Sequence, residues 1–358
     1  MPDSRLEAQV GVPDPSLASH VGEPVLALSP ILEDALLQAL APLPSQAPVA
    51  VALSGGADSG ALAIAATVVC RRSNRPLYFF HIHHGLFAQA EAWLEQVCEL
   101  ARLLAVPLEL RRVHVAQDSG LGLEGAARQA RYAALAELSA QHHVQALLLA
   151  HHRQDQAETV LLRLLRGAGV HGLAAMHADT QREGLRLLRP WLDIERAVLL
   201  AQVDSFTWQT GWLPVTDPSN VDPHFARGAL RAELLPVLIK YWPAWEQTLS
   251  RHARQSAEAA GVLDEVAQLD LASLDPQRED GSFCLRRWRA LSAARQALVL
   301  RYWLQQQGVA MPGDRRLADL MRQLRQLHAL GHDRDLLWQH GQTELRCRKG
   351  RVMLAAQS

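Results

Sequence analysis

The sequence contains almost no lysine. Its 358 residues include only Lys240 and Lys349, and the remaining basic residues are arginines. The 36 basic residues are balanced by 37 acidic ones, so the net charge is close to zero. Global charge therefore does not indicate a nucleic-acid partner, and any basic surface that binds one must be local.

Cysteine pairs and long apolar runs are also missing. The four cysteines, Cys70, Cys98, Cys284 and Cys347, are far apart and include no Cys-x-x-Cys pair. This argues against a zinc or iron–sulfur site and against a disulfide framework, and it favours the reducing cytoplasm. No apolar run reaches the roughly 18 residues that span a bilayer, so we expect no membrane partner. The first 27 residues have no apolar core segment, which excludes a signal peptide and favours a disordered tail.

A glycine-rich turn at residues 54–59, Ser-Gly-Gly-Ala-Asp-Ser, joins a predicted strand to a predicted helix. Val49 to Leu53 is a short apolar run, which is typical of a strand buried on both faces. Two glycines let the backbone curl tightly and approach a ligand. Backbone N–H groups at such a helix N-terminus, with the hydroxyls of Ser54 and Ser59, predict a phosphate site. A turn without a ligand is the alternative.

The usual phosphate loop ends in Gly-Lys-Ser/Thr, whereas this turn has no lysine. Positive charge must come from backbone amides, from an arginine or from a metal ion, and Asp58 is placed to hold Mg²⁺. The turn resembles the pyrophosphate-binding loop of the ATP pyrophosphatases, which cleave ATP between the α and β phosphates and activate a substrate as its adenylate. The resemblance implies that ATP is bound by Ser54, Gly55, Gly56, Ala57, Asp58 and Ser59.

Strand and helix patterns alternate through the first half of the chain. This alternation predicts an α/β fold, a parallel sheet flanked by helices with right-handed crossovers. We expect a first helix at 31–40, strands at 48–53, 77–83, 107–115 and 144–150, and helices at 58–71, 88–104, 123–141 and 154–165.

Beyond Gly167 the alternation is lost, and we expect irregular structure with short helices as far as residue 220. Residues 224–268 predict helices interrupted at Pro236 and Pro243. Helices at 284–307 and 315–330 and strands at 336–340, 344–348 and 352–355 predict a small α+β C-terminal domain. The expected organisation is a tail at 1–27, a catalytic domain at 28–228, and a helical linker with the C-terminal domain at 229–358.

The carboxyl ends of the predicted strands carry the chemically distinctive residues. Ligands of open parallel sheets bind beyond these ends. Residues 54–58 follow the first strand, 83–85 the second and 151–158 the fourth. We therefore expect these three segments to line one edge of the sheet.

Five ordered motifs, spread over residues 30–240, resemble the tRNA(Ile)-lysidine synthetases. The resemblance implies that His84 and Gly85 also contact ATP. The motifs lie at 81–86 (His-Ile-His-His-Gly-Leu), 124–132 (Glu-Gly-Ala-Ala-Arg-Gln-Ala-Arg-Tyr), 150–159 (Ala-His-His-Arg-Gln-Asp-Gln-Ala-Glu-Thr), 163–176 and 217–220 (Asp-Pro-Ser-Asn), the last with Arg227 and Arg231 beyond it.

Two acids in the first turn of the helix expected at 154–165 are candidates for binding an amine. Asp155 and Glu158 are three residues apart, so their carboxylates share a helix face and suit a small cation. The alternative is that they only complement the helix dipole. His151 and His152, at the preceding strand end, should point to opposite sides, and we expect only His151 to face the ligand. These histidines lack the i, i+4 spacing of a helical metal site.

Arginines provide candidate contacts to phosphates. Arg128 and Arg131 are three residues apart on the helix expected at 123–141, where a guanidinium could grip a phosphate or stabilise charge that develops on one. A solvated helix face paired with Glu124 is the alternative. Candidates for contacts to tRNA phosphates are Arg131, Arg166, Arg227 and Arg231.

The resemblance implies an ATP-dependent ligase that joins free L-lysine to carbon 2 of the wobble cytidine in tRNA(Ile) with a CAU anticodon. The cytosine oxygen attacks the α-phosphate and releases pyrophosphate, and the ε-amine of lysine then displaces AMP. The C-terminal domain, with its basic stretch at 345–351, would help to bind the tRNA, although a solvated strand edge also explains that stretch. The implied catalytic residues are Asp58, Arg128, His151, Asp155 and Glu158, with lysine bound by Asp155 and Glu158.

Two other functions fit part of the sequence. A thiolating tRNA enzyme of the same superfamily would normally contain paired cysteines, and this sequence has none. A non-catalytic nucleotide- or RNA-binding module is the alternative without chemistry. It predicts that Asp58, Asp155 and Glu158 are dispensable.

Overall fold

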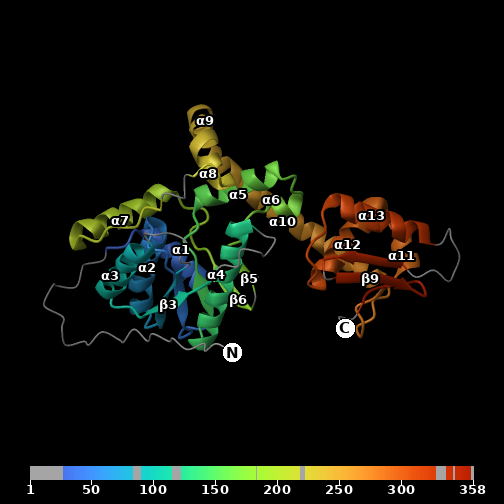
Figure 1. Ribbon diagram of the computed structural model, residues 1–358, viewed down its shortest axis with the longest axis horizontal. Coiled ribbons are helices and arrows are strands. Elements are labelled where there is room, and N and C mark those ends of the chain that lie inside the picture. The colour runs from blue at the N-terminus through green and yellow to red at the C-terminus, as the bar shows by residue number, and fades with distance from the viewer. Residues whose placement is uncertain are drawn as a thin grey trace. The chain divides into compact units, whose positions relative to one another are not determined.

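The computed structural model describes residues 27–83, 90–114, 122–182, 184–217, 222–327, 336–341 and 343–355 (Figure 1). The chain divides into two compact units. Of the described residues, the first unit holds 27–158 and 176–247, and the second holds 159–175 and 248–355.

A six-stranded sheet forms the centre of the first unit, in the order β3-β2-β1-β4-β6-β5. The first four strands and β6 run parallel, and β5 pairs antiparallel with β6 at one edge. The parallel sheet expected from the sequence is therefore present with one antiparallel edge strand. The strands are β1 (Val49–Ala52), β2 (Leu77–His83), β3 (Leu108–Arg112), β4 (Ala146–Leu148), β5 (Asp179–Arg182) and β6 (Leu185–Leu188).

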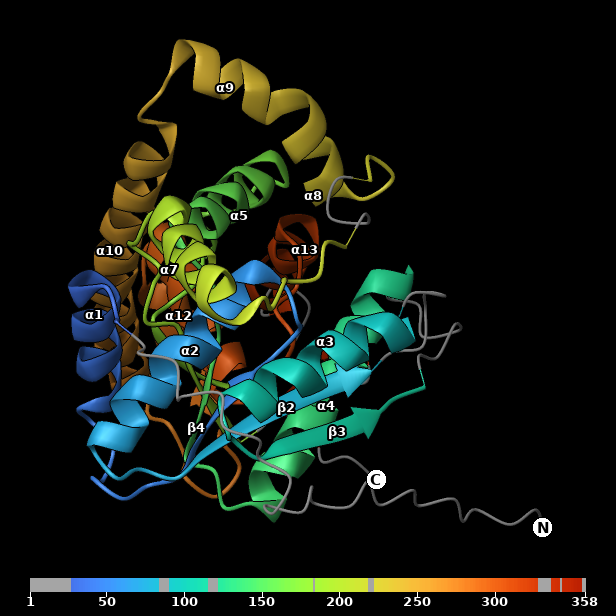
Figure 2. The ribbon, with the colours of Figure 1, turned by 90° about the vertical axis from the view of Figure 1, so that its left-hand side faces the viewer.

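Helices cover both faces of this sheet (Figures 1 and 2). On one face, α1 (Pro30–Leu40), α2 (Ala57–Arg72), α3 (Ala90–Leu103) and α7 (Arg196–Thr210) share one apolar core with the strands. On the other face, α4 (Gly122–Gln141) packs through Tyr132, Leu135 and Leu138. Burial on both faces explains why the central strands β1 and β4 read as continuous apolar runs.

Small residues set the close approach of α2 to its neighbours. Residues 61–66 of this helix are all buried, and most of them are alanines. At Gly60 a β-carbon would come within 2.7 Å of the Trp212 ring, so only glycine leaves room for that indole. The indole N–H of Trp212 in turn donates to the Gln96 carbonyl at 2.9 Å. These contacts fix the start of α2, and with it the glycine-rich turn.

The expectation of irregular structure after Gly167 is wrong in part. Residues 185–188 form β6, which extends the sheet beside β4, and residues 196–210 form the four-turn helix α7. The strand β5 is an exposed, polar edge strand whose residues lack the apolar pattern of a buried strand. The segment before it contains only the short helix α6 (Val170–Leu173).

The expected helical stretch after residue 224 is broken in a different way from the sequence prediction. It begins with α8 (Ala226–Ala229) and a π-type turn at Leu230–Leu234, labelled η3, and continues as α9 (Leu235–Tyr241). Pro236 lies in the first turn of α9, where a missing N–H costs little. Pro243 does separate α9 from the long helix α10 (Trp245–Ser273). Helix α5 (Arg153–Leu165) follows β4 as expected.

The second unit contains a four-stranded antiparallel sheet in the order β7-β10-β9-β8. Its core includes the buried rings of Phe283, Trp288 and Trp303. The single helix expected at 284–307 is instead strand β7 and two helices, because the chain turns at Ser292, whose hydroxyl caps the second helix. The elements are β7 (Phe283–Cys284), α11 (Leu285–Ala290), α12 (Ala293–Gln306), α13 (Asp314–Gln326), β8 (Leu336–His340), β9 (Thr343–Arg348) and β10 (Arg351–Leu354).

Across the described ranges, no helix combines the length and apolar character needed to cross a membrane. Residues 1–26, which hold nearly all of the predicted tail, lie outside the described residues.

Candidate active site

A cleft of about 960 Å³ opens at the carboxyl ends of β1, β2 and β4, entirely within the first unit. The position follows from the topology, because the chain leaves β1 and later returns to its other side as β4, which makes a switch point in the strand order. The expectation that the three strand-end segments line one edge is confirmed for their described residues. The polar lining includes Ser54, Asp58, Ser59, His83, Arg128, Arg131, His151, His152, Gln154, Asp155, Arg196, Thr216, Asp217, Arg227 and Arg231.

The glycine-rich turn is clamped from outside by a neighbouring segment. Gly55 has φ of +90°, a conformation that favours glycine. Its carbonyl accepts the backbone N–H of Val215 at 2.9 Å, and Gly56 forms a parallel bridge with the same residue. A β-carbon on Gly55 would lie 3.0 Å from Val97 and 3.2 Å from Val215. Gly55 therefore lies behind the turn and does not itself line the cleft.

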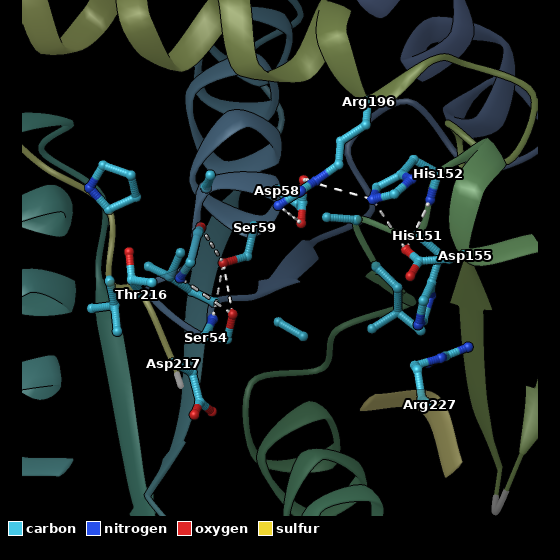
Figure 3. Close-up of a pocket in the computed structure, with 18 of the residues that line it drawn as sticks. Ser54, Asp58, Ser59, His151, His152, Asp155, Arg196, Thr216, Asp217 and Arg227 are labelled. Atoms are coloured by element: carbon cyan, nitrogen blue, oxygen red, sulfur yellow. Dashed lines mark hydrogen bonds and ion pairs between the residues drawn. The ribbon is translucent and has the colours of Figure 1, made fainter. Parts of the chain in front are cut away.

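Helix α2 begins at this turn without a side-chain cap. Its N-cap residue is Gly56, and no side chain accepts a hydrogen bond from the first turn. The N–H groups of that turn are therefore open to an anion. The two hydroxyls predicted to assist lie 2.9 Å apart, Ser54 Oγ to Ser59 Oγ, and Ser59 Oγ also donates to the Gly56 carbonyl at 3.0 Å (Figure 3). This pair holds the loop in shape.

Asp58 extends into the cleft and meets an arginine that the sequence analysis missed. Arg196, the first residue of α7, donates from Nε to Oδ1 at 2.9 Å and from Nη2 to Oδ2 at 3.3 Å. The absence of a lysine indicated that an arginine was one possible source of positive charge. No sequence pattern indicated that Arg196 would be this arginine, because it lies 138 residues from Asp58 in the chain.

His152 joins the phosphate loop to the acids of α5. Its Nε2 lies 3.7 Å from Asp58 Oδ1 and 3.4 Å from Asp155 Oδ2, and the ring is 2 % exposed (Figure 3). Both His151 and His152 line the cleft, so the expectation that only His151 would face it is wrong. The alternation rule for strands fails here because β4 ends at Leu148, before the histidines.

Asp155 stabilises the start of α5 and also faces the cleft. Its Oδ2 accepts the backbone N–H of His152 at 3.3 Å, the reciprocal contact of a capping box. Burial alone would raise the pKa of this carboxyl, but the nearby basic side chains His152, Arg227 and Arg231 lower it on balance. Asp155 therefore caps the start of α5, a role that the sequence analysis did not anticipate, and its carboxylate also faces the cleft.

Glu158 is fully buried and does not line the cleft. Arg231 donates to it from Nε at 2.8 Å and from Nη2 at 2.9 Å, and the same Nη2 lies 3.3 Å from Asp155 Oδ1. A second arginine, Arg227, also contacts this carboxylate, with its Nε 3.2 Å from Glu158 Oε2. The two acids therefore converge on one guanidinium, which shows that their shared face is suited to a cation. The π-type turn η3 carries Arg231 into this position.

The His151 ring is neutral near neutral pH. Burial lowers the pKa of His151 to about 3; Asp155 opposes this shift, and the arginines Arg189, Arg128 and Arg227 reinforce it. Its Nδ1 is buried and makes no hydrogen bond to a described residue. A neutral ring can support a ligand as a hydrogen-bond partner or by packing, but it adds no positive charge.

Arg128 and Arg131 of α4 gather around one aromatic ring. Their guanidinium carbons lie 5.2 Å and 5.6 Å from the Tyr132 ring centroid, and Arg182 of β5 lies at 4.2 Å. Burial lowers the pKa of Arg131, and the neighbouring Arg128 and Arg182 lower it further. The interaction with Tyr132 raises this pKa but does not outweigh the other effects. This collection of positive charge beside the cleft is a favourable environment for a phosphate.

The other predicted site residues have different locations. Ala57 and Gly56 line the cleft with Ser54, Asp58 and Ser59. Arg166 is exposed near the end of α5, belongs to the second unit and does not line the cleft. His84 and Gly85 lie outside the described residues, and the side chain of Glu124 is also outside them.

Asp58 fits a magnesium ion that is shared with a nucleotide better than a site made by protein alone. The described ranges contain no group of three or more histidine, cysteine or acidic side chains that could hold a metal. Mg²⁺ commonly binds one or two carboxylates together with substrate phosphates, and the Asp58 side chain is 30 % exposed in the cleft. None of the four cysteines lines the cleft.

A mostly parallel sheet with a lysine-free glycine-rich loop at its switch point defines the class of ATP-using PP-loop proteins. The sequence matches the PP-loop domain family over residues 28–238 and the TilS substrate binding domain over residues 283–353. The chain belongs to the tRNA(Ile)-lysidine synthase family, as its relatives show.

Two relatives illustrate the range of similarity. The tRNA(Ile)-lysidine synthase of Bordetella pertussis is 54% identical over 320 residues, which is 89% of this chain and 99% of the relative. The tRNA(Ile)-lysidine synthase of Pseudomonas aeruginosa is 40% identical over 332 residues, 90% of this chain and 72% of the relative. The family resemblance of the five motifs is confirmed, and the chain is an ATP-using enzyme.

A solved structure supports the fold alone. A U34-tRNA thiolase from Methanococcus maripaludis, determined with its [4Fe-4S] cluster, aligns with a TM-score of 0.52 at 16% identity. The alignment covers 63% of this chain and 78% of the thiolase.

Proposed function

We propose that this enzyme ligates L-lysine to carbon 2 of the wobble cytidine of tRNA(Ile) with a CAU anticodon, and consumes ATP to AMP and pyrophosphate. The observation that carries the proposal is the placement of two different sites in one cleft. The phosphate loop and the carboxylate of Asp155 lie on either side of His152. ATP and the amine of lysine can therefore both reach a cytosine base that enters this cleft.

In the first step the cytosine oxygen attacks the α-phosphorus of ATP, and pyrophosphate leaves. The amides at the start of α2, with Ser54 and Ser59, hold the pyrophosphate. Arg128 balances the charge that develops on the α-phosphate. Electrostatic stabilisation of this kind is usually the largest single contribution to catalysis. The step converts a poor leaving group, the carbonyl oxygen, into AMP.

Asp58 would hold a Mg²⁺ ion brought by ATP, because its carboxylate lies in the cleft beside the phosphate loop. The ion would neutralise phosphate charge and orient the leaving pyrophosphate. Because Arg196 now covers both carboxylate oxygens of Asp58, the carboxylate must open on one side before it can accept the ion.

In the second step the ε-amine of lysine attacks carbon 2 and expels AMP. Only about one lysine in a few thousand has a neutral ε-amine at neutral pH, so the site must bind the ammonium and then remove a proton. Asp155 makes the direct contact, since it lines the cleft. Glu158 contributes to the same cation site from behind, and it meets lysine only where Arg231 withdraws.

Each of the two units carries candidate contacts to tRNA. Arg131 lines the cleft and Arg166 is exposed on the second unit, while Arg227 and Arg231 reach phosphates by leaving Glu158. The basic stretch at 345–351 forms a β-hairpin whose turn, Lys349–Gly350, is exposed. We place the reaction in the cytoplasm, where tRNA, lysine and ATP occur together.

The test supplies purified protein with ATP, Mg²⁺, radiolabelled lysine and two transcripts of one tRNA(Ile), with CAU or UAU as the anticodon. We expect label in the CAU transcript alone, with one AMP released for each lysine incorporated. Label in neither transcript would refute the proposal, and label in both would refute its cytidine specificity.

The same assay separates the rival functions. A thiolating enzyme would transfer sulfur and leave lysine free, and a binding module would transfer neither. None of the four cysteines lines the cleft, so the site gives no support to a thiolating function.

A further inference from the structure

We propose that Arg196 binds the pyrophosphate portion of ATP and supplies the fixed positive charge that the lysine-free phosphate loop lacks. This inference rests on the proposed function, because pyrophosphate is the leaving group of its first step. It adds a ligand-binding residue on α7 to a site otherwise built from strand ends.

The distribution of cations in the cleft singles out Arg196. The described lining contains five arginines and no lysine. Arg227 and Arg231 meet Glu158, and Arg128 and Arg131 lie against Tyr132. Among the described residues, Arg196 is the cation with hydrogen bonds to the loop at 54–59. This guanidinium is therefore already attached to the loop that would hold the anion.

The guanidinium keeps donors in reserve. It uses Nε and Nη2 on Asp58, two of the five N–H groups of an arginine. No described residue accepts a hydrogen bond from Nη1, and the side chain is 44 % exposed. The planar fork of arginine matches phosphate oxygens. Arg196 can therefore bind a phosphate while one edge remains on Asp58.

The position of Arg196 is set by packing that is independent of any nucleotide. Helix α7 packs on α2 through Leu199, Val203 and Phe206, and α2 itself begins at the phosphate loop. The residue before it, Glu195, is held by Arg153 Nη1 at 2.7 Å. A donor that is positioned before its ligand arrives loses little freedom on binding. The arrangement is therefore that of a preorganised binding residue.

An exposed ion pair with Asp58 is the simpler interpretation of the same contact. Exposed ion pairs contribute little to folding, so the melting temperature of Arg196→Ala should equal that of the wild type. The two interpretations differ in affinity for phosphate. If Arg196 only orients Asp58, changes at either residue should alter pyrophosphate binding alike. If Arg196 binds phosphate, the two changes should act in opposite directions without metal.

The experiment is calorimetric titration of the full-length protein with pyrophosphate and with AMP, in buffer that contains EDTA. We expect Arg196→Ala to bind pyrophosphate about tenfold to a hundredfold more weakly, the effect of losing a charged hydrogen bond. AMP lacks the pyrophosphate, and its affinity should change less than about twofold. Arg196→Lys should be intermediate because it keeps the charge without the fork.

The matched control is Arg102→Ala, which removes an arginine from an exposed ion pair with Glu99 outside the cleft lining and should bind pyrophosphate as the wild type does. Asp58→Asn should bind pyrophosphate equally or more tightly without metal, since it removes a like charge. Wild-type affinity in Arg196→Ala, equal losses in Arg196→Ala and Asp58→Asn, or no binding by the wild type in EDTA would each overturn the proposal. Lysine transfer by the wild type tests the proposed function separately, because it does not depend on which side chain holds the pyrophosphate.

Discussion

The guanidinium of Arg231 grips the carboxylate of Glu158 through two parallel hydrogen bonds, 2.8 Å and 2.9 Å long, across 73 residues of sequence. Glu158 is fully buried, whereas the Arg231 side chain is 23 % exposed. The pair therefore connects α5 inside the unit with the turn η3 at its surface. It also places a cation of the protein where the sequence predicted the ammonium of a substrate.

Removing this cation should destabilise the first unit. Arg231→Ala leaves a buried carboxylate with Arg227 as its remaining cation, at 3.2 Å. Breaking a fully buried pair costs roughly 3–5 kcal/mol. Because Arg231 is partly exposed and Arg227 remains, we expect a loss of about 2 kcal/mol. Urea denaturation followed by circular dichroism measures this difference.

The double variant Arg231→Met with Glu158→Gln is the control. It removes both charges at once, so it should be more stable than Arg231→Ala. If Arg231→Ala unfolds at the wild-type urea concentration, the pair does not stabilise the fold and the guanidinium is held there by other contacts.

The charge of Asp155 should matter for lysine and not for ATP. Asp155→Asn keeps an oxygen that can accept the His152 backbone N–H, so the start of α5 remains capped. The variant loses the negative charge that attracts the ammonium. We expect the lysine concentration for half-maximal ligation to rise about tenfold or more, while adenylation of the tRNA continues at nearly the wild-type rate.

Comparing Asp155→Asn with Asp155→Ala separates the effect of charge from the effect of capping. Asp155→Ala removes both, so it should show the same lysine requirement and a further loss of stability of about 1 kcal/mol, typical of a lost cap. The prediction would be contradicted by a variant that adenylates tRNA much more slowly than the wild type yet reaches half-maximal ligation at the wild-type lysine concentration. Pyrophosphate release and labelled lysine incorporation measure the two steps.

A methyl group at Gly55 should disable nucleotide binding. Gly55→Ala combines two effects, because φ is +90° and the new carbon would lie 3.0 Å from Val97 and 3.2 Å from Val215. The backbone strain costs about 1–2 kcal/mol, and the contacts with Val97 and Val215 push the loop away from the bridge that shapes it. We expect ATP binding, measured by calorimetry, to fall below detection.

Gly211→Ala is the matched control for this strain. Gly211 ends α7 with φ of +76°, and a β-carbon there would meet no atom within 4 Å. It should lose similar stability and bind ATP normally. Equal ATP affinity in both variants would show that the loop tolerates a side chain at Gly55.

The strands β1, β2 and β4 could be predicted because most of their residues are buried in the middle of the sheet. Such strands read as apolar runs between helices, and the turn at 54–59 has few alternatives. The hairpin β5–β6 could not be predicted in this way. The edge strand Asp179–Arg182 is polar and gains its structure by pairing with β6.

The site was predictable in its residue types more than in its contacts. The acids at 155 and 158 share a helix face, as their spacing requires, yet their cation is Arg231, which the sequence suggested only for tRNA. The missing lysine indicated an arginine, but the pairing of Arg196 with Asp58 depends on how α7 packs on α2. Contacts between distant segments are set by tertiary packing, and local spacing carries no record of them.

The half-buried ring of His151 should make the protein sensitive to acid. Burial lowers the pKa of His151 from its ordinary 6.5 to about 3. Between these values the unfolded chain binds a proton that the folded chain does not, so the stability contributed by His151 is complete above about pH 6.5 and is lost as the pH falls. His151→Gln cannot titrate and should lose less stability than the wild type between pH 7 and pH 5, by about 2 kcal/mol. Urea denaturation at pH 8, 7, 6 and 5 gives the two slopes.

His81, whose pKa burial also lowers, is present in both proteins and cancels in the difference. Parallel slopes would mean that the His151 ring becomes charged in the folded protein as readily as in the unfolded chain.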